Sequence, residues 1–247
     1  MEQTFDPSAF DRLAAAEPGH FWFEERRTLL LWALRHYFPA ARNFCEVGCG
    51  TGFFLAGLAQ CRPELRLTGV DYYSEALAHA RHRLPGVTLE LGDILKADRS
   101  GSFDVVGCFD VLEHIPDDIN ALAALATRLR PGGGLLLTVP QHPSLWSVAD
   151  EIGHHQRRYR REELVRKVHT AGFQVLRVTS FVSVLLPLLW INRKRAASRD
   201  DALKELTVAP VLNAILRILL KLERGLIRAG ISLPAGGSLL VVARKLV

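Results

Sequence analysis

Three glycines crowd into a five-residue turn that directly follows a carboxylate. The segment CEVGCGTGFF spans 45–54 and places Glu46 just before Gly48, Gly50 and Gly52. Glycine adopts positive φ without strain and lets another backbone or a ligand approach closely. The turn therefore predicts either a tight strand-to-helix connection or a place where a ligand lies across the bare backbone.

Carboxylates recur at the ends of the apolar runs that follow along the chain. Asp71, Asp93 and Asp110 each stand at or just after the end of such a run, and Glu46 lies near the end of the first. In an open sheet of parallel strands, ligands bind at the carboxyl ends of the strands. Four carboxylates on that edge would form an anionic rim, which suits a positively charged cofactor and would repel a pyrophosphate.

Two places on this rim suit an adenosine ligand. Asp71 could accept hydrogen bonds from both hydroxyls of a ribose; the alternative is that it only caps a helix expected to begin near Ser74. Asp93 could accept a hydrogen bond from an adenine amino group while Ile94 packs on the ring. A dinucleotide is the first rival, but its Gly-x-Gly-x-x-Gly fingerprint requires a third glycine where this chain has Phe53. The NAD interpretation is therefore weakened.

Strand-like runs alternate with helix-compatible segments through most of the chain. Strands are expected at 43–48, 66–71, 87–91, 103–109, 134–139, 174–181 and 238–246. Helices are expected at 22–38, 52–61, 74–84, 117–130 and 161–173. This alternation predicts βαβ units around a parallel sheet with both faces covered, which is a doubly wound α/β fold.

Five motifs in this order resemble those of the class I S-adenosylmethionine-dependent methyltransferases, of the small-molecule or lipid type. They are EVGCGTG (46–52), GVDYYSEAL (69–77), GDIL (92–95), FDVVGCFDVLEHIPD (103–117) and RPGGGLLLTVP (130–140). The resemblance implies a Rossmann-like, seven-stranded sheet, mostly parallel with an antiparallel last strand. It also implies four parts: an N-terminal lid (1–39), a cofactor-binding core (40–181), a helical insertion (182–235) and the last core strand (236–247).

The same resemblance implies a role for each rim residue toward S-adenosylmethionine, whose product is S-adenosylhomocysteine; no metal is expected. Glu46 would read the amino group, Asp71 the ribose diol, and Asp93 with Ile94 the adenine, while Asp110 would lie near the sulfonium. The other cofactor-binding positions expected are Gly48, Cys49, Gly50, Gly52, Tyr72 and His114. From the N-terminal helix, Trp22 or Phe23 would cover the sulfonium and Arg26 or Arg27 would pair with the cofactor carboxylate. The alternative is that this helix only packs its aromatic residues on the sheet.

The segment after the fifth strand is the expected wall of the methyl-acceptor site. A hydroxyl acceptor needs its proton removed, so His154 or His155 is the expected general base, with Asp110 and His114 as the next candidates. The side chains expected to contact the acceptor are His142, Trp146, Arg157, Arg158 and Tyr159. Arginine suits an anionic group. The alternative is a solvated loop that leads into a helix.

The insertion 182–235 combines the apolar run FVSVLLPLLWI with a Lys/Arg-dotted amphipathic segment. Neither reaches the roughly 20 apolar residues needed to cross a bilayer. We expect the insertion to lie at a membrane surface, or to cover the sheet as a substrate lid or a homodimer surface. Each option favours an apolar or lipid-linked acceptor.

Composition and cysteine use bound the remaining possibilities. The chain has 247 residues and a net charge of +5. Its four cysteines form neither a CxxC pair nor zinc-type spacing, which indicates reduced thiols. We therefore expect a cytoplasmic protein, either free or at the inner face of a membrane. The N-terminus has no apolar run of the secretory kind. Without an NPPY-type motif or RNA-binding module, nucleic acid is not an expected partner. Methylation of a protein or another small molecule, and a non-catalytic cofactor-binding scaffold, remain as alternatives.

Overall fold

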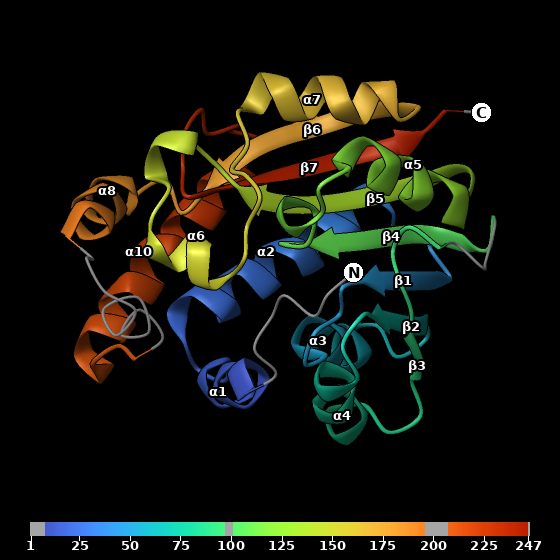
Figure 1. The fold of residues 1–247 in the computed structure, drawn as a ribbon, viewed down its shortest axis with the longest axis horizontal. Coiled ribbons are helices and arrows are strands. Elements are labelled where there is room, and N and C mark those ends of the chain that lie inside the picture. The colour runs from blue at the N-terminus through green and yellow to red at the C-terminus, as the bar shows by residue number, and fades with distance from the viewer. Residues whose placement is uncertain (1–7, 97–100, 196–206, 247) are drawn as a thin grey trace.

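The structure is a computed structural model that describes residues 8–96, 101–195 and 207–246 (Figure 1). Residues 1–7 of the expected lid, residues 196–206 of the expected insertion and the last residue lie outside the described part. The side chains of 192–195, the basic run NRKR, lie outside it too.

One seven-stranded sheet forms the centre of the molecule, in the order β3-β2-β1-β4-β5-β7-β6 (Figure 1). The strands are β1 Asn43–Val47, β2 Arg66–Asp71, β3 Thr88–Leu91, β4 Phe103–Phe109, β5 Leu129–Pro140, β6 Phe173–Phe181 and β7 Ser238–Lys245. Strands β1 to β5 pair in parallel, and β7 pairs antiparallel to both β5 and β6. The predicted doubly wound α/β sheet with an antiparallel last strand is confirmed.

The strand order reverses between β1 and β4, which are neighbours in the sheet but not in the chain. In an open α/β sheet this switch point opens a crevice at the carboxyl ends of the strands. Glu46 lies near the end of β1, and Asp110 directly follows β4. Topology therefore brings these two carboxylates to the place where this type of sheet binds ligands.

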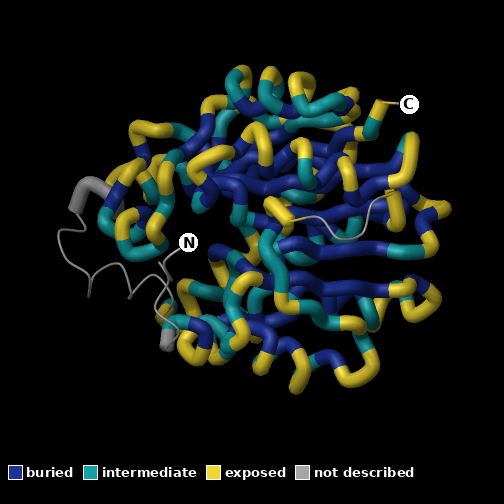
Figure 2. Tube along the Cα trace, turned by 45° about the vertical axis from the view of Figure 1, so that its right-hand side comes forward, coloured by how far each residue is buried: buried dark blue, intermediate teal, exposed yellow. Residues whose placement is uncertain are grey.

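Helices cover both faces of the sheet. They are α1 Ser8–Ala16, α2 Phe21–Tyr37, α3 Phe53–Cys61, α4 Ser74–Arg83, α5 Asp118–Arg128, α6 Val148–Ile152, α7 Arg161–Thr170, α8 Leu186–Arg195 and α10 Pro210–Arg228, with short 3-10 turns η1 Leu112–His114 and η2 Pro143–Leu145. Alternation along the strands sends Phe44 and Val105 to a core shared with α2, α3 and α10, and Cys45 and Val106 to a core shared with α5 and α7. Figure 2 shows the strands as a buried centre under exposed turns.

The expected insertion is held against the N-terminal helix through one face of α10. Leu216, Leu220 and Ile227 are buried in the core that α2 also lines. An ion pair joins Arg224 of α10 to Glu25 of α2 at 2.9 Å. Glu223, also buried, accepts hydrogen bonds from the backbone N–H groups of Ser183 and Val184. Because these contacts reach both α2 and the chain that follows β6, α10 is part of the folded body.

The opposite face of α10 is apolar and exposed. Val211, Ile215, Ile218, Leu222 and Leu226 lie three or four residues apart and are each roughly half exposed or more. We call these five residues the outer stripe of α10. None of the described helices has the length and apolar character needed to cross a membrane. A helix with two apolar faces, only one of them covered, indicates a surface with a use outside the fold.

Candidate functional site

The glycine turn follows β1 in a backbone conformation that glycine alone adopts easily. Gly48, Gly50 and Gly52 have φ of 73°, 53° and 77°. A Cβ on Gly48 would lie 2.2 Å from Cγ2 of Val111, and one on Gly52 would lie 2.8 Å from Cδ1 of Leu84. A Cβ on Gly50 would meet nothing within 4 Å. The first and third glycines are thus required by packing and φ, while the middle one faces open space.

Asp71 anchors this turn to the end of β2. Its carboxylate accepts hydrogen bonds from the backbone N–H of Gly50 at 2.7 Å and of Tyr73 at 2.9 Å. The bond to Tyr73 lies directly before α4, whose own N-cap side chain makes no capping bond, and the bond to Gly50 shows that Asp71 does more than lead into that helix. Burial raises the pKa of Asp71, against the lowering effect of these N–H groups. Each carboxylate oxygen has a second lone pair, which remains for a hydroxyl group.

Glu46 is the best evidence for a cationic ligand beside the turn. It is 4% exposed, and within the described chain its Oε2 atom has no hydrogen-bond partner. Burial raises its pKa well above the usual value, while the positive charge of Arg26 lowers it. A buried carboxylate oxygen without a partner costs free energy unless a donor reaches it. An ammonium group beside the bare turn would supply that donor, so these residues fit S-adenosylmethionine.

Asp110 follows β4 and faces the N-terminal helix α2. The Arg26 guanidinium lies 2.6 Å from Oδ2 of Asp110 and 4.9 Å from the centre of the Trp22 ring. The Thr138 hydroxyl donates to Oδ1 of Asp110 at 3.1 Å, and the backbone of Asp110 has a φ of 55°. The structure therefore brings Trp22 and Arg26 to the rim, with Arg26 against a protein carboxylate.

The far end of the rim follows β2 and β3. Tyr72 is 39% exposed, and its ring lies against Tyr73. The Asp93 carboxylate accepts a hydrogen bond from the backbone N–H of Leu95 at 2.9 Å. Ile94 is buried in the core shared with β1 and β4. The Cys49 thiol is buried and donates to the backbone carbonyl of Gly50 at 4.0 Å, and no disulfide joins any of the four cysteines.

Sequence reasoning missed a polar cluster that closes the turn from the N-terminal side. Glu17, 5% exposed, follows α1 and accepts a hydrogen bond from the Thr51 hydroxyl at 2.7 Å. Arg83 of α4 pairs with the same carboxylate and donates to the Thr51 hydroxyl at 2.8 Å. Neither residue belongs to a motif, and their separation in the sequence hides the contact.

On the acceptor side, Asp150 is the centre of a buried network. It is 0% exposed, accepts from the Ser147 backbone N–H at 2.9 Å, and so caps α6. Its Oδ1 atom lies 2.8 Å from Nδ1 of His155 and 2.7 Å from Nε of Arg158. A carboxylate on Nδ1 fixes the ring and directs Nε2 away from the carboxylate. Of the two adjacent histidines, His155 is thus the one that the structure orients.

His155 lies beside Glu113 and His114, which follow β4 in the turn η1. The two imidazole rings are 4.7 Å apart. Burial and the neighbouring His155 lower the pKa of His114 to about 4. Glu113 is 1% exposed, and among the described residues its Oε2 atom has no hydrogen-bond partner. We call Glu113, His114 and His155 the acceptor-side triad.

The expected anion site at the paired arginines is wrong, because both are already neutralised. Arg157 lies 2.9 Å from Asp118, and Arg158 pairs with Asp150 in the interior. The Tyr159 side chain is 0% exposed and its hydroxyl donates to Asp118 at 2.9 Å, so Tyr159 is not placed to contact an acceptor either. The solvated-loop alternative fails too. Arg157 and Tyr159 connect the loop to α5, and Arg158 connects it to α6.

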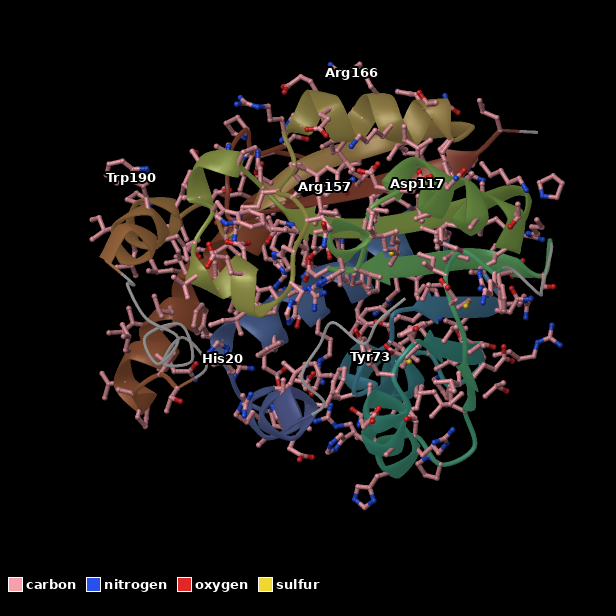
Figure 3. The ribbon with its side chains drawn as sticks, in the orientation of Figure 1. His20, Tyr73, Asp117, Arg157, Arg166 and Trp190 are labelled. Carbon is pink, nitrogen blue, oxygen red and sulfur yellow. The ribbon has the colours of Figure 1, made fainter. Side chains whose placement is uncertain are left out.

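The remaining acceptor-side candidates lie nearer the surface. His142 has a φ of 63° and a buried Nε2 atom that lacks a hydrogen-bond partner within the described chain. Trp146 is 39% exposed. His154 is exposed, with a φ of 53°, and does not belong to the triad. Figure 3 shows the density of polar side chains around Arg157, between α5 and α6.

Comparison with known proteins places this geometry in a family. Residues 15–178 match the methyltransferase domain family. A protein named ubiquinone biosynthesis O-methyltransferase from Xanthomonas axonopodis pv. citri is 32% identical over 183 residues, which cover 66% of this chain and 74% of that one.

Solved structures share the fold at lower identity. An S-adenosylmethionine-dependent methyltransferase from Mesorhizobium loti has a TM-score of 0.57 at 20% identity, covering 86% of this chain and 96% of that one. Phosphoethanolamine N-methyltransferase 2 from Haemonchus contortus, in complex with S-adenosyl-L-methionine, has a TM-score of 0.65 at 18% identity, covering 100% of this chain and 59% of that one. The family match, the glycine turn, the strand order and the buried Glu46 oxygen without a hydrogen-bond partner in the described chain agree with one another. The chain belongs to the class I S-adenosylmethionine-dependent methyltransferases.

Proposed function

We propose that this enzyme methylates an oxygen atom of a small acceptor that is apolar or linked to a lipid. The observation that carries the proposal is the rim itself, where the buried, partnerless Glu46 oxygen and the carboxylates of Asp71 and Asp110 surround a bare turn. Two observations support oxygen as the atom that receives the methyl group. Relatives are named O-methyltransferases, and the acceptor-side triad offers groups that can activate a hydroxyl.

Bound S-adenosylmethionine supplies a methyl group activated by a positively charged sulfur. The chain's own residues bind and orient it: Glu46 accepts from the ammonium group, Asp71 holds the ribose, and Asp93 with Ile94 holds the adenine. Asp110 complements the sulfonium. Trp22 and Arg26 of α2 cover the crevice. Arg26 pairs with Asp110 at 2.6 Å in this structure and would exchange that partner for the cofactor carboxylate. Exclusion of water by this helix favours the transfer.

Titration calorimetry tests the cofactor half of the proposal. We expect saturable binding of S-adenosylmethionine and S-adenosylhomocysteine, and no binding of NAD. The acceptor half is tested by incubating labelled S-adenosylmethionine with fractionated cell extract and identifying the labelled product by mass spectrometry. Label in a lipid-soluble molecule, attached through oxygen, is the expected result. Label only in polypeptide would favour the protein methyltransferase alternative, and no transfer to any fraction would favour a non-catalytic scaffold.

We place activation of the acceptor at His155, because the buried Asp150 orients its ring. His155→Ala should lower kcat by about 10² to 10⁴, the usual range for losing a group that activates a proton donor. Binding of S-adenosylmethionine should stay unchanged, since His155 is not among the rim residues. His154→Ala is the matched comparison on the adjacent residue and should have much the smaller effect. An equal or reversed order of the two effects would place activation elsewhere.

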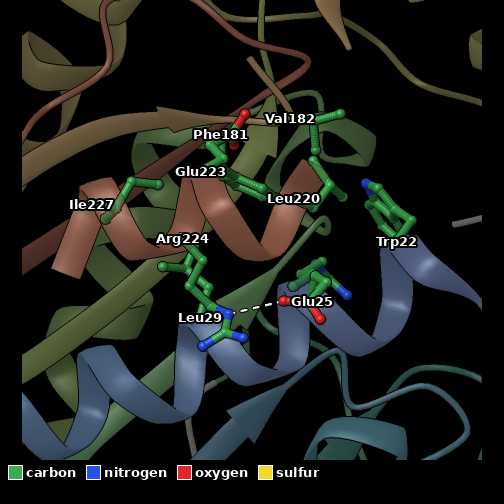
Figure 4. Close-up of a pocket in the computed structure, with 10 residues that line it drawn as sticks. Trp22, Glu25, Leu29, Phe181, Val182, Leu220, Glu223, Arg224 and Ile227 are labelled. Atoms are coloured by element: carbon green, nitrogen blue, oxygen red, sulfur yellow. Dashed lines mark hydrogen bonds and ion pairs between the residues drawn. The ribbon is translucent and has the colours of Figure 1, made fainter. Parts of the chain in front are cut away.

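A lipid-linked acceptor agrees with the surroundings of α10. A small pocket lies between α2 and α10. Its walls combine apolar side chains, among them Trp22, Leu220 and Ile227, with the charged Glu25, Arg26, Glu223 and Arg224 (Figure 4). Beyond this pocket, α10 turns its outer stripe to the surface, with Lys221 and Arg228 along one flank. The only acidic residue of α10, Glu223, is buried. We propose that 182–235 contacts the anionic inner face of a membrane from the cytoplasm.

Vesicle co-sedimentation tests this contact. The wild-type chain should bind vesicles of phosphatidylglycerol and phosphatidylcholine more strongly than vesicles of phosphatidylcholine alone. Ile218→Asp with Leu222→Asp should lower the bound fraction about tenfold or more, because two charges would enter the apolar boundary. Leu176→Asp, an exposed leucine on the edge strand β6, is the control. If both variants bind alike while the parent forms a dimer in sedimentation that the stripe variant loses, the stripe is a homodimer surface.

A further inference from the structure

The acceptor-side triad has the composition of a metal site. A carboxylate oxygen of Glu113 and one ring nitrogen each of His114 and His155 lie within 4.8 Å of one another. Two histidines and one carboxylate are the protein ligands of several catalytic zinc sites and of the facial-triad iron sites. Metal bonds of about 2.0 to 2.2 Å would require these atoms to move closer together when the ion binds.

Two independent observations indicate that the acceptor-side triad is arranged to bind a ligand. First, the Oε2 atom of Glu113 is buried without a hydrogen-bond partner in the described chain, on a residue that is 1% exposed. Second, the Nδ1 atom of His155 already faces the buried Asp150 carboxylate at 2.8 Å. A histidine that binds a metal usually presents its other nitrogen to a carboxylate in this manner, which fixes the tautomer and orients the free nitrogen.

We infer that Glu113, His114 and His155 bind a divalent transition-metal ion, with zinc the best match to the donors, and that the ion holds the methyl-acceptor oxygen. Three protein ligands leave positions open for that oxygen. The cation would lower the pKa of the hydroxyl, whose proton then leaves to water. The resulting oxyanion forms a bond to the methyl carbon as the carbon–sulfur bond breaks, and the electron pair of that bond stays on sulfur.

This site refines the role of His155, which would activate the acceptor through the ion instead of taking the proton itself. The triad also adjoins the cofactor crevice: Asp110 acts electrostatically on both Glu113 and His114, and Arg26 acts on Glu113 and Glu46. The role of the ion rests on the proposed function, whereas its binding does not. The two can therefore be tested apart.

Cobalt binding tests the site without relying on activity. The untagged full-length protein is stripped with a chelator and titrated with Co²⁺, followed by calorimetry and by visible absorption of the bound ion. We expect a single Co²⁺ per chain. His155→Ala and Glu113→Gln should each weaken Co²⁺ binding about tenfold or more. His154→Ala removes a neighbouring, exposed imidazole and should leave Co²⁺ binding unchanged. Circular dichroism confirms that each variant is folded.

The outcomes separate the site from the proposed function. Absence of Co²⁺ binding to the parent, or equal losses in His154→Ala and His155→Ala, would overturn the metal site. If Co²⁺ binds but the stripped protein does not take up S-adenosylmethionine, the metal site stands and the proposed function fails. If zinc restores methyl transfer to the stripped enzyme, the role of the ion is supported. Full transfer in the stripped enzyme would overturn that role.

Discussion

Asp71→Ala should weaken binding of S-adenosylmethionine by about a hundredfold or more. Hydrogen bonds to a charged group contribute about 1.5 to 3 kcal/mol each, and this carboxylate is proposed to accept from both ribose hydroxyls. The same substitution frees the backbone N–H of Gly50, which Asp71 accepts at 2.7 Å, so the glycine turn also loses its anchor to β2. Calorimetric titration with S-adenosylmethionine and S-adenosylhomocysteine measures the effect on both ligands.

A conservative variant and a distant control make this result specific. Asp71→Asn keeps one acceptor oxygen and should show an intermediate loss of affinity. Asp117→Ala removes an exposed carboxylate that caps α5 through Asn120; it should cost about 1 kcal/mol of folding free energy and leave the affinity unchanged. If Asp71→Ala binds the cofactor as tightly as the parent, Asp71 only holds the turn and the ribose assignment is wrong.

Asp150→Ala should lower the free energy of unfolding by about 3 to 5 kcal/mol. Arg158 is 3% exposed at its side chain and pairs with Asp150 at 2.7 Å, so the substitution removes the neutralising carboxylate from a buried guanidinium. The cap of α6 and the orientation of His155 are lost as well. For a chain of this size we expect the midpoint of thermal unfolding to fall by roughly ten degrees. Urea unfolding followed by circular dichroism measures the change.

A second substitution distinguishes a buried charge from a general packing defect. Asp150→Ala combined with Arg158→Leu removes both charges and should recover part of the lost stability, because no unpaired charge remains. A double variant as unstable as the sum of the two single variants would argue that the pair contributes independently. A loss of less than about 0.5 kcal/mol in Asp150→Ala, typical of a surface position, would contradict the network.

Most of the fold and of the cofactor side could be predicted because the signals are local in the chain. Apolar runs define the strands, and each rim carboxylate stands within a few residues of a strand end. Once strands are parallel and their helices cross over in the usual sense, their carboxyl ends must meet at one edge. The expected positions of Glu46 and Asp71 on the rim needed only this backbone rule, whereas their roles toward the cofactor came from the resemblance to a family. The closely spaced glycines likewise predict backbone at positive φ, since other residues rarely adopt that conformation.

The acceptor side could not be predicted with the same success, because its contacts join segments that no periodicity relates. The sequence predicts an anion site for the acceptor at Arg157 and Arg158, yet each meets a carboxylate from its own chain. Glu113 was part of a motif without an assigned role, and only folding brings it to His155. Loop conformation and the cost of leaving a charge buried and unpaired decide which side chains remain available.

The sequence by itself determined the order of strands and helices, the bare turn and the carboxylates at the strand ends, because each of these depends on residues close together in the chain. Tertiary structure alone decided that Arg26 lies on Asp110, that Asp150 selects His155 over His154, and which face of α10 is left uncovered. The physical reason is that these contacts depend on how separate elements pack, and packing is settled by shape and by paired charge across the whole molecule.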